Sequence, residues 1–117
     1  MTGLIMLLLV LHVVPGVYWA GSTFVLARSA GAGADRMFGA QMGAATLAVL
    51  AGIGLMVLLH RGPQGPMEHT LAVGAACAVV AAGVQGAMHR RSPAAAQRIA
   101  AGLLVITIIC MVIARYT

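Results

Sequence analysis

Charged residues divide the chain into four long apolar runs. The runs occupy residues 3–27, 37–60, 69–89 and 99–114, and none of them contains Asp, Glu, Lys or Arg. An α-helix needs about 20 consecutive apolar residues to cross the hydrocarbon core of a membrane. Three runs reach this length, and Arg98 and Arg115 at the ends of the fourth can extend toward the headgroups. We therefore expect transmembrane helices at about 3–27, 37–60, 69–89 and 99–115.

The segments between these runs are short and contain residues that end helices. Residues 28–36 are mostly Gly, Ala and Ser, and residues 61–68 contain two Pro and two Gly. In residues 90–98, Ser92 followed by Pro93 is typical of a helix start. Connectors this short make consecutive helices antiparallel. The sequence predicts an all-α, up-down-up-down four-helix membrane bundle that forms a single domain over residues 1–117.

The overall composition supports a membrane protein. Hydrophobic residues make up 62% of the chain and charged residues 8%, against about 25% charged residues in soluble domains. These values exclude a water-soluble enzyme, a disordered tail and a nucleic-acid module. The net charge of +5 is better explained by membrane topology than by DNA binding, because the arginines stand between apolar runs.

The arginines also predict an orientation. The first and third connectors carry five of them, whereas the other side of the membrane carries only Arg61 and Arg115. By the positive-inside rule, the first and third connectors face the cytoplasm and both termini lie outside. We expect a multi-pass protein of a bacterial-type inner (plasma) membrane. The five arginines are Arg28, Arg36, Arg90, Arg91 and Arg98.

The first run is expected to be a retained helix and not a cleaved signal peptide. It lacks a basic leading segment and is longer than the usual apolar core of a signal peptide. It also holds His12, Pro15, Tyr18 and Trp19, which a signal peptide does not need.

The absence of acidic residues from the runs excludes one class of function. A small proton-coupled exporter requires a membrane carboxylate, and no run contains one. The sequence also shows no nucleophile–base pair and no phosphate-binding loop. Enzyme status therefore stays open, and any catalysis would depend on a cofactor, as in a haem-dependent membrane oxidoreductase.

Histidines are the ionisable groups that remain as candidate ligands. His12 lies about a third of the way along the first run, and a buried imidazole must find a partner. One interpretation is a hydrogen bond to a neighbouring helix, through Gln85 or Thr107. The other is a metal ligand, because neutral imidazole suits haem iron. His60 and His69 lie toward the same outer leaflet, whereas His89 ends the third run beside Arg90 and Arg91.

Other residues in the runs admit two interpretations. Trp19 lies two helical turns after His12 on the same face, which suits either a flat cofactor or packing. Small residues on the second run and throughout the third favour tight packing in a monomer or dimer, or leave room for a cofactor ring. Met56 and His60 lie on one face and could bind copper. We interpret Cys77 and Cys110 as residues that only pack against neighbouring helices. On the second run, the small residues that recur every four positions are Ala44, Ala48 and Gly52.

Residues 11–21 (LHVVPGVYWAG) resemble a known helix. The opening helix of the CopD-type membrane domain also has a His seven residues before a Trp that is followed by x-Gly. The four-helix protoporphyrinogen oxidase family HemJ begins a helix in a similar way. The helix end Met88-His89-Arg90 is also similar to that of CopD domains. Both families tend to carry a Lys on the third helix, whereas this chain has none, and Ser22 replaces their usual second Gly.

The resemblance implies a small four-helix membrane protein in which His12 is the matching histidine. A HemJ-like protein would bind haem b with His12 as an axial ligand, and a CopD-like protein would handle copper. Our main hypothesis is a haem b protein that transfers electrons at the outer leaflet, with a quinone or a redox protein as partner. In this hypothesis His12 is one iron ligand and either His60 or His69 is the second. Trp19 would lie beside the porphyrin ring, and Arg61 would pair with a haem propionate.

Two alternatives stay open. The first is copper transport or resistance, with His12, Met56 and His60 as transient ligands. The second is a cofactor-free accessory subunit of a membrane complex, in which His12 only links helices. A homodimer is compatible with each hypothesis.

Overall fold

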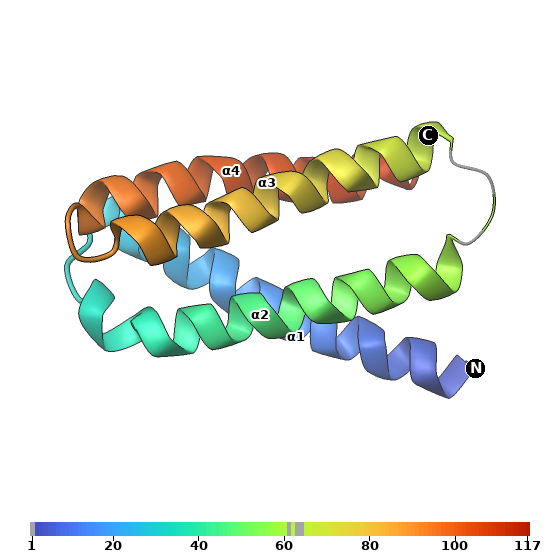
Figure 1. Ribbon diagram of the computed structural model, residues 1–117, viewed down its shortest axis with the longest axis horizontal. Helices are drawn as coiled ribbons and strands as arrows, with labels where there is room; N and C mark the ends of the chain where they lie inside the picture. The colour runs from blue at the N-terminus through green and yellow to red at the C-terminus, as the bar shows by residue number, and fades with distance from the viewer. Residues whose placement is uncertain (1, 61, 63–64) are drawn as a thin grey trace.

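Four antiparallel helices account for nearly the whole chain, in the order that the apolar runs predict (Figure 1). The computed structural model describes residues 2–60, 62 and 65–117. It is 87% helical. The predicted all-α four-helix architecture is therefore confirmed. The helices are α1 (Thr2–Arg28), α2 (Ala34–Leu59), α3 (Pro66–Met88) and α4 (Pro93–Ala114).

All four helices begin before their apolar runs do, and α4 begins the furthest ahead of its run. Ser92 is the N-cap of α4 and Pro93 is its first residue, as the Ser-Pro signal predicts. The start of α3 is fixed by Glu68, whose Oε1 accepts a hydrogen bond from the Gly65 amide at 2.8 Å. Charged and polar residues next to the runs are thus helical too, and this places Gln97 inside α4.

Most large apolar side chains point out of the bundle, and most of the hydrophobic side chains that point into it are small. Leu, Ile, Val and Met side chains are exposed on all four helices, whereas most of the buried hydrophobic residues are alanines. All four helices are long and apolar enough to cross a membrane. This distribution is the one expected when lipid is the solvent, because close helix packing there relies on small residues.

The bundle consists of two tight hairpins. Helix α1 packs closely on α2, and α3 packs closely on α4. The hairpins meet mainly through α1 and α4, while α2 and α3 touch at few points (Figure 1). We call this sparse α2–α3 interface the seam. It holds an apolar groove of about 210 Å³ that is lined by Ala45, Thr46, Val49, Leu50, Val79 and Ala82.

The α1–α2 and α3–α4 connections lie together at one end of the bundle (Figure 1). We call this the arginine-rich end, because it carries Arg28, Arg36, Arg90, Arg91 and Arg98. Gly31 allows the α1–α2 connection to touch the first turn of α4. It has a φ of +82°, and a Cβ there would lie 2.9 Å from the backbone nitrogen of Ala94.

Replacing Gly31 with Ala should destabilise the bundle by about 1–3 kcal/mol, because the methyl group meets backbone atoms and the positive φ strains an alanine. The measurement is reversible unfolding in detergent or bicelles. Gly39→Ala is the matched control, since a Cβ at this helical position meets no atom within 4 Å. Equal stability of the Gly31 and Gly39 variants would contradict the role given to Gly31.

Candidate functional site

His12 lies between α1 and α2, and its ring bonds to the backbone of α2. Its Nδ1 is 2.7 Å from the carbonyl oxygen of Ala48. Gly52, one turn further along α2, allows this approach, because a Cβ there would lie 2.9 Å from Cε1 of the ring. Neither Gln85 nor Thr107, the partners considered from the sequence, bonds this ring.

The bond to Ala48 fixes the tautomer of His12. A carbonyl oxygen only accepts, so Nδ1 carries the proton and donates it, and Nε2 of the neutral ring keeps its lone pair. Histidines that bind metals commonly hold their other ring N–H on a carbonyl or carboxylate in this way. In this arrangement Nε2 is the one ring atom that could bind a metal ion. The same hydrogen bond also serves as a cross-link between α1 and α2.

The fold does not bring His12 together with the other predicted ligands. His60 follows Gly52 by eight residues, which is about 12 Å along a helix axis. Its Nδ1 is 2.8 Å from Oε2 of Glu68. His69 is an exposed residue in the first turn of α3. Arg61, the predicted propionate partner, lies outside the described residues.

Among the described residues, no group of three or more His, Cys, Asp and Glu side chains could hold a metal ion. Met56 is half-buried, one turn beyond Gly52 on α2. Cys77 and Cys110 are free thiols. His12 and His60, two of the copper ligands suggested by the sequence, therefore belong to no such group.

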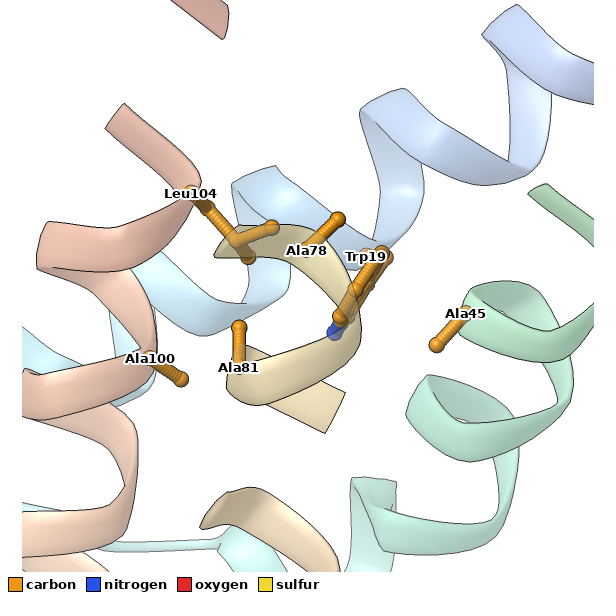
Figure 2. Packing of buried hydrophobic residues seen from close by; sticks show 6 residues of the cluster. All are labelled: Trp19, Ala45, Ala78, Ala81, Ala100 and Leu104. Atoms are coloured by element: carbon orange, nitrogen blue, oxygen red, sulfur yellow. The ribbon is translucent and has the colours of Figure 1, made fainter. Parts of the chain in front are cut away.

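Trp19 lies in the centre of the bundle, 3% exposed. Its indole packs with alanines from α2, α3 and α4 and with Leu104 (Figure 2). The small residues of these helices thus surround a flat ring that belongs to the protein itself. The alanines are Ala45, Ala78, Ala81 and Ala100.

The polar centre of the bundle is a network of three buried glutamines, one each from α2, α3 and α4. Gln41, Gln85 and Gln97 are at most 1% exposed. Gln41 and Gln97 form a reciprocal amide pair, in which each Nε2 donates to the other Oε1 at 3.2 and 3.3 Å. Gln85 Nε2 donates to Gln97 Oε1 at 3.2 Å. The three amides therefore tie three helices together.

Helix α1 joins the network through Trp19, Ser22 and Thr23. The indole N–H of Trp19 donates to Gln85 Oε1 at 2.7 Å. Thr23 Oγ1 accepts from Gln85 at 3.0 Å and from Gln41 at 3.2 Å, and it donates to the Trp19 carbonyl at 2.7 Å. A network that extends over all four helices and closes on itself stabilises one arrangement of the bundle.

Most of this network escapes sequence reasoning. The sequence suggests Gln85 only as a partner of His12, and Gln41 stands within an apolar run without a motif. Gln97 falls in the connector predicted at residues 90–98, whereas the structure places it inside α4, which begins at Pro93. The available signal was the rarity of amides in apolar runs, since a polar group in a membrane needs a partner inside the protein.

The comparisons with known proteins found no match. Neither a family model nor a curated protein nor a solved structure matched this chain. The candidate site therefore rests on its own geometry.

Replacing Gln85 with Leu should lower the free energy of unfolding by about 1–2 kcal/mol, because the buried Trp19 N–H loses its acceptor. Unfolding in detergent measures the loss. Thr46→Val is the control, since the exposed Thr46 hydroxyl bonds only the Met42 carbonyl of its own helix. The network would have no stabilising role if both variants unfolded like the wild type.

Proposed function

We propose that this protein binds haem b through His12 and takes part in electron transfer within the membrane. The observation that carries the proposal is the His12 ring, anchored on the Ala48 carbonyl at 2.7 Å with its Nε2 left as a lone-pair ligand. Bound haem b would supply a reversible one-electron couple. The chain supplies an apolar surrounding and the ring that would hold the iron.

His12 could supply one ligand to the iron of this group. His12 has the right tautomer and is only partly buried. The second ligand predicted from the sequence does not fit this arrangement, because His60 is held by Glu68 and His69 lies at the start of α3. His12 is therefore the one ligand that we propose from this chain.

The orientation that we propose follows from the charges. The arginine-rich end faces the cytoplasm of a bacterial-type plasma membrane, because five of the seven arginines lie there. His12 then lies in the outer half of the bilayer. A quinol dissolved in the lipid or a redox protein at the outer surface is the class of electron partner that can reach it.

The test is the absorption spectrum of the protein, purified in mild detergent from cells supplied with haem. We expect a Soret band that disappears in His12→Ala, because the iron loses its ligand. His69→Ala is the matched control, an exposed histidine on the other hairpin, and it should keep the band. A colourless wild-type protein with intact helicity would refute the proposal.

Gly52→Ala tests the same site without removing the imidazole. The new methyl group would lie 2.9 Å from Cε1 of His12, so the ring must move away from the Ala48 carbonyl. We expect haem occupancy to fall several-fold while the helical content stays unchanged. Gly43→Ala, where a Cβ meets no atom within 4 Å, should bind haem like the wild type. Full occupancy in Gly52→Ala would argue against His12 as the ligand.

A second function is favoured by the closed centre of the bundle. Trp19 and the three glutamines form hydrogen bonds with one another, and His12 already has a hydrogen bond to Ala48. A cofactor-free accessory subunit would need nothing more, and its lipid-facing helices would bind a partner protein. This function predicts a colourless protein without bound metal that is purified in a larger complex.

A further inference from the structure

The seam between α2 and α3 is the sparsest contact between consecutive helices in the described part of the bundle. Its groove is lined almost wholly by apolar side chains. Three of the lining residues, Ala45, Val49 and Ala82, also belong to or pack against the cluster around Trp19. Separation of α2 from α3 would therefore bring lipid to the indole.

One contact joins the two helices across the seam at the arginine-rich end. The ring of His89, which caps α3, stacks on Phe38 of α2 with ring centroids 3.8 Å apart and an interplanar angle of 15°. Nε2 of the same ring lies 3.2 Å from Oδ1 of Asp35, at the start of α2. We call this arrangement the His89 clasp.

The clasp fits a neutral His89 better than a protonated one. Its Nδ1 is buried and has no hydrogen-bond partner. Protonation would place a charged N–H there without an acceptor, which a buried site penalises strongly. The attraction to Asp35 offsets little of this penalty, because that side chain is 93% exposed and water screens it.

The described ionisable groups at this end besides His89 and Asp35 are arginines, which stay charged throughout the range of pH 5 to 8. The arginines add like charge near a protonated ring. They are Arg28, Arg36, Arg90, Arg91 and Arg98. His60, Glu68 and His69 lie at the opposite end of α2 and α3.

We propose that the His89 clasp is a proton-sensitive latch that keeps the seam closed while His89 is neutral. Protonation of the ring releases α3 from Phe38, and the seam opens toward the lipid beside Trp19. The latch does not depend on haem binding, because its residues come only from α2 and the end of α3.

Trp19 is the only tryptophan of the chain, so its fluorescence reports the opening. The protein is placed in vesicles with brominated acyl chains, which quench an indole on contact. Between about pH 8 and about pH 5 the neutral form of a histidine falls from dominant to minor, so quenching should rise roughly twofold or more. Quenching that does not change with pH in the wild type would overturn the proposal.

Two variants separate the latch from a general effect of acid. His89→Phe keeps the stacking on Phe38 but cannot titrate, so quenching should stay low at every pH. Asp35→Asn keeps an acceptor for Nε2 but removes the negative charge, so opening should begin at a higher pH. His60→Gln, at the other end of the seam, should behave like the wild type.

The results with these two variants also determine whether the latch proposal is upheld or overturned. A rise in quenching in His89→Phe equal to that of the wild type would overturn the proposal. If His89→Phe does not fold, as judged by circular dichroism, the direction of the change in Asp35→Asn decides. An unchanged or opposite pH dependence in that variant would then exclude the latch.

Discussion

A polar side chain within a lipid bilayer must find its hydrogen-bond partners inside the protein, because the hydrocarbon offers none. In this bundle that constraint falls on Gln41, Gln85 and Gln97, which are almost fully buried. Each of these amides forms its hydrogen bonds with side chains of other helices. A rotation of any one helix would leave buried donors unpaired, so the network selects one rotational register for the helices of the bundle.

The packing around the network follows from the same environment. Burial of apolar surface does not drive helices together in lipid, so contact area and small side chains decide which faces meet. The alanines around Trp19 allow one large ring to fill the centre and to reach Gln85 with its N–H. Bulky Ile, Leu and Val residues are then left for the lipid-facing surface.

The sequence predicts the architecture well and the candidate site only in part. Apolar runs and short connectors define four antiparallel spans, because these features depend on local composition. The partner of His12 is a backbone carbonyl, and every residue has one, so no sequence pattern marks Ala48. The pairing of Gln41 with Gln97 depends on how α2 and α4 are rotated, which short-range patterns do not specify. The ligand role of His12 and the latch of His89 stay predictions.

The glutamine network divides along the two hairpins. Within the first hairpin, Gln41 donates to Ser22 and Thr23 of α1. Within the second, Gln85 donates to Gln97. Each hairpin can therefore enter the bilayer with one amide NH2 group already partnered, that of Gln41 in the first and that of Gln85 in the second. The remaining bonds, among them Gln97 Nε2 to Gln41 Oε1 and the Trp19 N–H to Gln85 Oε1, form only when the two hairpins meet.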